Sequence, residues 1–555
     1  MATHSMRAWF REGTPWIWLN AGALAISLMA VVGLLVYILA KGIVHFWPHP
    51  IMQADYRYED GRSELVIGEI AGEEAVTAAR LREAGEWLPG EDISVTRVLA
   101  KVGNRDVYGR DFRWLIEPRV TNVQFPADLV VVERREWGNF YGRVQDVREN
   151  GTVVASGEPA WPQLRQRLDR ALDLFADIRR IEKHDIGRIN RGIERIRLDR
   201  RRLDLDGVKD AAAFAALDAK KQALDAEYEV LAGKLALLHE QMARDSVTLV
   251  IADGATREVP LARIVHVERP NALSLPGKIG HFLGKLWEFV SDEPRESNTE
   301  GGIFPAIFGT VTMVFLMTLV VTPFGVVAAI YLREYASQGV MTRTVRIAVN
   351  NLAGVPSIVY GVFGLGFFVY FLGGNIDRLF FPEAAPAPVF GTGGLGWASL
   401  TLALLTVPVV IVATEEGLSR VPKSLREGSL ALGATKAETL WRIIIPIASP
   451  AIMTGMILAI ARAAGEVAPL MLVGVVKLAP SLPIDGNAPF VHLDQKFMHL
   501  GFHIYDVGFQ SPNVEAARPL VFATAFLLVL VIVALNLLAI TIRNRLREKN
   551  KALEN

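Results

Sequence analysis

Two ionisable residues, Arg462 and Glu466, lie in an otherwise apolar stretch from Ile447 to Val476. Their spacing of four residues predicts side chains on one face of a helix. A charge at membrane depth costs on the order of several kcal/mol unless it is paired or hydrated, and a guanidinium presents the paired donors that suit an oxyanion. We interpret Arg462 as lining a pathway for an anion, with Glu466 neutralising it when no anion is bound. The alternative is an ion pair that only fixes helix packing.

A second candidate is the charged, amphipathic segment from Glu415 to Pro446, which lies between two apolar stretches. Ser424 to Leu432 and Lys436 to Ile445 are predicted as two short helices, with Gly433 free to adopt the positive φ that ends the first. Such a bent pair forms a knob on one face of a membrane, where it would dock onto a partner.

The order and spacing of residues in this knob resemble the EAA loop of the permease subunits of ATP-binding-cassette importers. That pattern reads E-A-A, three residues, G, nine residues, I-x-L-P. Glu427, Gly433 and Pro446 fit it, whereas Gly428 and Ser429 replace the alanines and Ile445 replaces the leucine. The resemblance implies that the following residues couple to an ATPase: Glu427, Gly428, Ser429, Gly433, Ala434 and Pro446.

These residues must be positioned by membrane-spanning helices. The chain has 555 residues, 51% of them hydrophobic and 21% charged, so apolar and charged residues must be segregated. Six stretches are long enough to cross about 30 Å of hydrocarbon. The predicted spans are Trp16 to Ala40, Ile303 to Leu332, Ile347 to Gly374, Leu395 to Thr414, Ile447 to Val476, and Pro519 to Ile542.

Basic residues in the short loops set the predicted orientation. They lie on the same side as the N-terminus, at Arg7, Arg11, Arg333, Arg343, Arg346, Arg420, Lys423, Arg426, Lys436, Arg442, Arg543, Arg545, Arg547 and Lys549. We therefore expect both termini and the loop 415–446 to be cytoplasmic. The large region 47–298 and the loops 375–393 and 477–516 are then periplasmic.

The region 47–298 carries charges throughout and is predicted to be an α+β domain. Short β-rich runs flank a helical insertion, at Leu129 to Val132, Thr152 to Ala155, Val247 to Ile251 and Ile264 to Val267. The insertion, about 161–243, has apolar residues at heptad spacing and predicts an antiparallel hairpin on the order of 60 Å long. Its interleaved acidic and basic residues disfavour nucleic acid as a partner. The region lacks a two-lobed α/β pattern, so we expect a contact surface and not a binding protein.

No enzyme motif is evident in this chain. Gly391 to Gly396 fits G-x-G-x-x-G but opens a span, so we interpret it as a flexible loop. Gly280 to Lys285 is too short for a phosphate-binding P-loop. The absence of cysteine excludes disulfides and thiolate metal sites. We expect no cofactor or metal in this chain, and ATP-Mg bound by a partner subunit.

Four segments resemble the PstA-type phosphate importer permeases: GGIFPAIFGT, TPFGVVAAIYLREYA, GVPSIVYGVFGLG and MTGMILAIARAAGEVAPLMLVG. The resemblance is strong over residues 301–542, loose over the first span and absent from the soluble region. It implies a type I importer permease of the inner membrane. From the distribution of charged and apolar residues we divide the chain into 1–46, 47–298, 301–545 and a tail 546–555. The implied partners are a PstC-type permease, a PstB-type ATPase dimer, a PstS-type phosphate-binding protein and membrane lipid. Two alternatives stay open: transport of another oxyanion, such as phosphonate or sulfate, and a membrane sensor.

Overall fold

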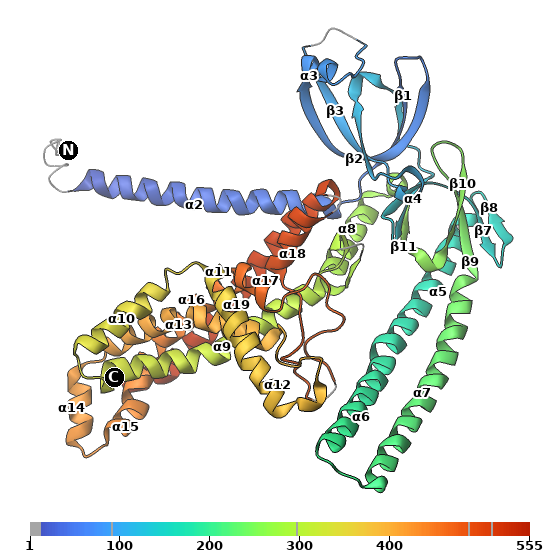
Figure 1. Ribbon diagram of the computed structural model, residues 1–555. Helices are drawn as coiled ribbons and strands as arrows, with labels where there is room; N and C mark the ends of the chain where they lie inside the picture. The colour runs from blue at the N-terminus through green and yellow to red at the C-terminus, as the bar shows by residue number, and fades with distance from the viewer. Residues whose placement is uncertain (1–12, 90–92, 296–297, 487–488, 512–513, 555) are drawn as a thin grey trace, which may run out of the picture.

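A computed structural model describes residues 13–89, 93–295, 298–486, 489–511 and 514–554. Arg7 and Arg11, used above to predict orientation, lie outside the described residues. The chain forms a bundle of apolar helices and a β-rich domain from which a long helical hairpin extends (Figure 1).

The described residues contain six helices that are long and apolar enough to cross a membrane, which confirms the predicted number. These spans are Pro15–Phe46, Phe304–Tyr335, Ser357–Phe380, Leu395–Ser419, Lys436–Gly465 and Ala517–Arg545. Two of them differ from prediction.

The third predicted span, Ile347 to Gly374, is wrong because the chain breaks ahead of Pro356. A separate amphipathic helix, α10 (Val340–Leu352), ends there, and α11 (Ser357–Phe363) begins directly after the proline. Proline disfavours helical geometry in the residue before it, which favours a break between the two helices at this point. The span then continues through a π-helical segment, η8 (Gly364–Gly373), into α12 (Gly374–Phe380).

The fifth predicted span, Ile447 to Val476, begins and ends too late. Helix starts already at α15 (Lys436–Thr439) and runs through the π segment η10 (Leu440–Ile444) into α16 (Ile445–Gly465). It stops at Gly465, whose carbonyl cannot accept a helical hydrogen bond from Pro469 because proline has no N–H. A short helix, α17 (Ala468–Val473), follows after the break.

The bundle is built around α13 (Leu395–Ser419), which packs against α9 (Phe304–Ile330) and α16. Its Leu402 lies in a fully buried core with Met313 of α9 and Ala463 of α16. Helix α19 (Val514–Glu554) covers α16, whereas α2 (Thr14–Ile43) lies apart from the bundle over most of its length (Figure 1). Only the end of α2 approaches α19, where a Cβ on Gly42 would lie 2.8 Å from the Ala523 backbone.

The glycine-rich segment Gly391 to Gly396 was predicted to be flexible, and this interpretation is wrong. A Cβ on Gly393 would lie 2.5 Å from the Val473 carbonyl oxygen, and one on Gly394 would lie 2.5 Å from that of Asp494. The glycines are therefore needed for close backbone approach, which lets three loops pack together at the start of α13.

The β-rich domain contains two main antiparallel sheets. The first has the strand order β4-β3-β2-β1-β5, and the second has the order β10-β9-β7-β6-β11, with β8 paired to β7. The bounds in the first sheet are β1 (Ile51–Arg57), β2 (Ser63–Thr77), β3 (Ser94–Lys101), β4 (Phe112–Ile116) and β5 (Val120–Gln124). Those in the second are β6 (Leu129–Arg134), β7 (Asn139–Glu149), β8 (Thr152–Ser156), β9 (Asp245–Val250), β10 (Thr256–Pro260) and β11 (Ile264–Glu268).

The predicted strands coincide with β6, β8, β9 and β11, all in the second sheet, while the first sheet was not predicted. Its longest strand, β2, carries several exposed acidic residues and does not alternate cleanly between apolar and polar positions. Two short helices, α3 (Ala78–Glu83) and α4 (Arg105–Tyr108), complete this part of the domain.

Two long antiparallel arms form the hairpin between β8 and β9 (Figure 1). The first arm consists of α5 (Ala160–Arg180), a π segment η3 (Ile181–Ile186) and α6 (Gly187–Leu205), and the second is α7 (Ala211–Ala243). The base of α5 is part of the domain core, because Leu164 and Leu168 are buried against the second sheet. Further out, α6 contacts η9 (Pro382–Ala384), a 3₁₀ turn between spans three and four.

The domain joins the bundle through η1 (Val44–Phe46), α8 (Leu275–Ser291) and a small sheet of β12 (Pro294–Arg295) and β13 (Glu300–Gly301). Phe289 in α8 packs against Phe46 in a tilted arrangement, with ring centroids 5.0 Å apart. The Ile303 N–H donates to the Phe289 carbonyl at 2.8 Å, just before α9 begins. Helix α8 is therefore fixed to the ends of both the first and the second span.

Candidate functional site

The predicted docking knob is formed by α14 (Lys423–Ala431) and α15, which protrude from the end of the bundle far from the sheets (Figure 1). Gly433 has φ +88°, which ends the first helix, and no atom lies within 4 Å of a Cβ built on it. The second helix begins with a capping box, in which the Thr435 hydroxyl accepts from the Glu438 N–H while the Glu438 carboxylate accepts from the Thr435 N–H. The local sequence thus determines both the end of the first helix at Gly433 and the start of the second helix at Thr435.

The knob is anchored to the end of span two by charge. Arg426 donates to Glu334 at 2.6 Å, and the Glu334 side chain is only 10% exposed. Lys436 bonds the Glu334 backbone carbonyl and lies 4.5 Å from the centre of the Tyr335 ring. Glu334 and Tyr335 end the π segment η7 (Tyr331–Tyr335) that extends α9, so these contacts attach the knob to the end of span two.

The predicted coupling residues have two different environments. Glu427, Gly428 and Gly433 are exposed, and the neighbouring Leu432 is 91% exposed. By contrast Ser429 is buried, and its hydroxyl lies 2.9 Å from that of Thr439 on the second helix. The last two predicted positions, Ala434 and Pro446, are partly buried. The exposed set forms the surface available to a partner, while Ser429 joins the two helices of the knob.

Arg462 and Glu466 do not share a helical face, so the predicted geometry is wrong. Arg462 lies in the last turn of α16, whereas Glu466 follows the helix end with extended backbone at φ −79° and ψ 136°. The structure nevertheless brings the two side chains together, with Arg462 Nε 3.8 Å from Glu466 Oε1. That distance is too long for a hydrogen bond, and the side chains are 31% and 21% exposed. The guanidinium therefore keeps donors that can bind an anion.

The two candidate sites lie at opposite ends of one continuous helical segment. Lys436 in the knob begins the span, and Arg462 is in its last turn before Gly465. The knob and Arg462 are therefore joined by one helical segment. Neither sequence motif alone indicates this connection.

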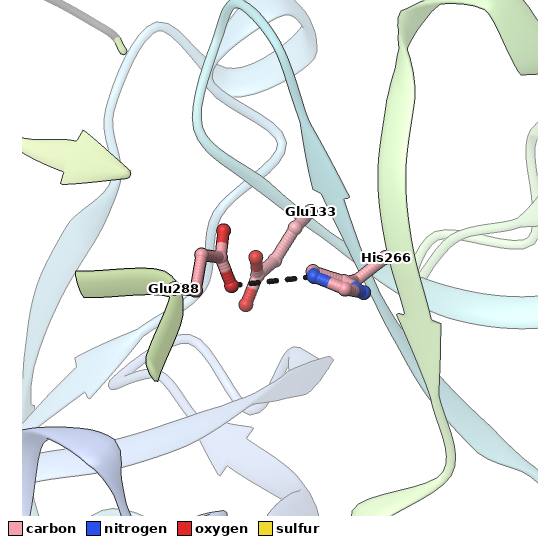
Figure 2. A group of neighbouring side chains, drawn as sticks. All are labelled: Glu133, His266 and Glu288. Atoms are coloured by element: carbon pink, nitrogen blue, oxygen red, sulfur yellow. Dashed lines mark ion pairs between the residues drawn. The ribbon is translucent and has the colours of Figure 1, made fainter. Parts of the chain in front are cut away.

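Glu133, His266 and Glu288 converge where α8 meets the second sheet (Figure 2), and their ligand atoms lie within 4.8 Å of one another. Lys285 Nζ lies 2.5 Å from Glu133 and 2.9 Å from Glu288, and Arg295 Nη2 lies 2.9 Å from Glu288. Burial would raise the pKa of Glu288, but a hydrogen bond with His266 and the charges of Lys285 and Arg295 hold it well below its ordinary 4.5. The charges of Lys285 and Arg295 compensate the two carboxylates, and we call this cluster the salt-bridge junction.

A second buried polar group lies between spans five and six, near α18 (Leu500–Tyr505). Asp506 pairs with Lys477 at 3.0 Å and accepts from Asn298 at 3.2 Å. His499 and His503 are almost fully buried nearby. Burial lowers the pKa of His499 from 6.5 to about 3 and that of His503 to about 4, so both rings are neutral at physiological pH.

Sequence reasoning missed Glu334, Tyr335 and the Arg191–Asp485 pair. The first two are in the segment TPFGVVAAIYLREYA, which was recognised as a motif, but only the fold places them beside the knob. Arg191 on α6 lies 3.6 Å from Asp485 in the loop after span five. The hairpin therefore contacts the loops at the end of the bundle that faces the domain.

The six apolar helices define a multi-pass membrane protein. A family profile described as "Binding-protein-dependent transport system inner membrane component" matches residues 321–549. The phosphate transport system permease protein PstA 1 of Mycobacterium tuberculosis (strain CDC 1551 / Oshkosh) is 36% identical over 247 residues, which cover 44% of this chain and 71% of that protein. The probable phosphate transport system permease protein PstA of Methanocaldococcus jannaschii is 32% identical, covering 39% and 67%.

The chain belongs to the PstA-type family of binding-protein-dependent permeases and has the type I importer fold with six apolar helices, as predicted. The PstC protein of Xylella fastidiosa is also similar, at 32% identity, covering 39% of this chain and 67% of that protein. The solved structure of the MetNI methionine ABC transporter aligns at 18% identity and a TM-score of 0.32, covering 49% and 99%.

Proposed function

We propose that this chain forms half of the translocation pathway of an ATP-driven phosphate importer. The observation that carries the proposal is the single helical segment Lys436–Gly465, which joins an EAA-like knob to Arg462. The similarity to proteins named as phosphate transport permeases supports phosphate as the anion.

The knob is the proposed docking site for a separate PstB-type ATPase dimer, which would bind ATP-Mg and hydrolyse it. Exposed Glu427 can accept hydrogen bonds from the ATPase groove, and Leu432 offers an apolar contact beside it. Closure of the ATPases would push the knob and, through Arg426 and Glu334, the end of α9. The chain itself then needs no cofactor and acts as a transport subunit, not as an enzyme.

Arg462 is the proposed anion-attracting residue of the pathway. Its loose pairing with Glu466 leaves guanidinium donors for an oxyanion, and the nearby carboxylate weakens retention once the anion is bound. One arginine serves phosphate, phosphonate or sulfate equally well in chemical terms, so another oxyanion is the alternative substrate. The other half of the pathway would come from a PstC-type permease.

The proposed topology has both termini and the knob in the cytoplasm, in accordance with the basic residues of the short loops. The domain 47–298 is then periplasmic. Because α6 contacts η9 and Arg191 lies beside Asp485, the hairpin would rest on the outer loops of the permease. We propose that it forms part of the surface that receives a PstS-type binding protein.

The test is phosphate uptake by the complete complex in proteoliposomes. Arg462→Ala should abolish uptake while the complex still assembles, whereas Arg462→Lys should keep some activity because charge remains without the bidentate fork. Competition by sulfate and by a phosphonate identifies the anion. Uptake by Arg462→Ala at the wild-type rate would leave the pair as a packing device.

A further inference from the structure

Helix α8 has an unusual distribution of polarity. Its exposed residues are Leu275, Pro276, Ile279, Gly280, Leu283, Gly284, Leu286 and Trp287, so its exposed face carries no charge. A helix on the surface of a soluble domain normally presents charged residues to water. The exposed stripe on α8 is instead continuous over the length of the helix, and Trp287 at its end is 71% exposed.

Three ionisable residues of α8, His281, Lys285 and Glu288, face the protein, and the fourth, Lys278, is partly buried. Lys285 and Glu288 enter the salt-bridge junction with Glu133 and His266, and His281 lies 3.9 Å from Glu268 on β11. Each of these charges therefore has a partner on the domain. The apolar side chains lie on the exposed face. In an isolated soluble domain, these side chains would be in contact with water.

The place of α8 in the fold identifies what covers the stripe. Phe282 packs 6.0 Å from the Trp47 ring and Phe289 packs 5.0 Å from the Phe46 ring, where the first span ends. The C-terminal end of α8 is also hydrogen-bonded to the start of α9. The Ile303 N–H donates to the Phe289 carbonyl, and the Phe304 N–H donates to the Asp292 carbonyl. Helix α8 is thus attached to the ends of two helices that are long and apolar enough to span a membrane.

We infer that α8 is a membrane-contacting helix, whose stripe Leu275, Ile279, Leu283 and Trp287 lies in lipid at the boundary between headgroups and acyl chains. Tryptophan is enriched at this boundary because its ring is apolar and its N–H is polar. Interfacial helices bury their apolar face about 5–10 Å into this layer. With its opposite face locked into the salt-bridge junction, α8 holds the β-rich domain at a fixed height and angle to the bilayer. This role does not depend on which anion is transported.

The absence of native cysteine makes a direct test possible. Single variants Ile279→Cys, Leu283→Cys and Trp287→Cys would be nitroxide-labelled in the full chain, reconstituted into phosphatidylethanolamine/phosphatidylglycerol vesicles. Collision rates with oxygen, which concentrates in lipid, and with a water-soluble nickel chelate would then be measured. Val230→Cys is the matched control, since it is an apolar helical position that is 72% exposed on the hairpin arm α7.

The expected result is high oxygen and low nickel accessibility at all three stripe positions, with the reverse at Val230. Three positions on successive turns keep the test valid if one variant fails to reconstitute. Nickel accessibility at the stripe equal to that at Val230 would overturn the inference. Protection from both reagents that appears only with the partner permease present would also overturn it, because the stripe would then be a protein interface.

Discussion

Arg426 and Glu334 form a 2.6 Å hydrogen-bonded ion pair across 92 positions of sequence, joining the knob to the end of span two. Both side chains are mostly buried, so removing one partner leaves a charge that water reaches poorly. The pair is the most direct attachment between the proposed ATPase docking surface and a helix other than its own.

Breaking this pair should uncouple ATP hydrolysis from transport. Arg426→Ala or Glu334→Gln is expected to destabilise the knob by about 1–3 kcal/mol, so that ATPase activity continues while phosphate uptake falls. The matched control is Arg420→Ala, because its partner Glu416 and Arg420 itself are 61% and 72% exposed and such pairs contribute little. Equal uptake in the Arg426 and Arg420 variants would remove the pair from the coupling route.

Gly433 and Gly428 should respond to alanine in opposite ways. Gly433 has φ +88°, where a side chain costs about 1–2 kcal/mol, so Gly433→Ala should loosen the bend and weaken ATPase pulldown. Gly428 lies within α14 with no atom within 4 Å of a Cβ. Gly428→Ala should therefore stabilise the helix by about 0.5–1 kcal/mol and leave docking intact. Normal docking by Gly433→Val would show that the bend is not required.

Acid should destabilise the bundle through its buried histidines. Between pH 6.5 and about 3, the unfolded chain binds a proton at His499 that the folded chain does not, so stability falls as pH falls across this range. His503 adds the same effect between pH 6.5 and about 4. Each histidine should contribute a slope of up to about 1.4 kcal/mol per pH unit.

Thermal midpoints of the detergent-solubilised chain from pH 7 to pH 4 would measure that slope. His499→Asn is the appropriate variant, because its side-chain oxygen can still accept from the Gly501 N–H that now bonds His499 Nδ1. In the His499→Asn variant, the thermal midpoint should fall less steeply as the pH decreases. An unchanged pH profile would mean that His499 is hydrated in the folded state.

Shortening the hairpin should separate its contact with the permease loops from the contribution of its base to the domain core. Replacing residues 189–228 with a short glycine turn removes the Arg191–Asp485 contact but leaves Leu164 and Leu168 in the domain core. We expect this variant to fold and assemble, with slower uptake at limiting concentrations of binding protein. Leu164→Ala, which empties a fully buried position, should instead cost about 2–5 kcal/mol of domain stability. Unchanged uptake in the trimmed variant would exclude a receiving role for the hairpin.

The number of spans and the family could be predicted because long apolar runs and ordered motifs are local in sequence. The helix break before Glu466 could have been anticipated from Pro469, yet the apolar run continues to Val476 and hides it. The first sheet was missed because its pairing is long-range and β2 has a mixed burial pattern. Arg191 and Asp485, or Arg426 and Glu334, are brought together only by the fold, and neither pair has a local signal.

The π segment η10 between Thr439 and Ile445 has a consequence for how the knob and Arg462 are linked. A π turn holds one residue more than an α turn, and an α-helix turns about 100° and rises about 1.5 Å per residue. Relaxation of this bulge to α geometry would therefore rotate the knob relative to Arg462 without breaking the rod between them. The rotation thus depends on the number of residues in Leu440–Ile444 and not on their side chains. A one-residue deletion in Leu440–Ile444 would convert the π segment to an α turn and keep the present orientation of the knob relative to Arg462, so the rotation would no longer be possible. Exchanging one aliphatic side chain there for another would leave the rotation possible.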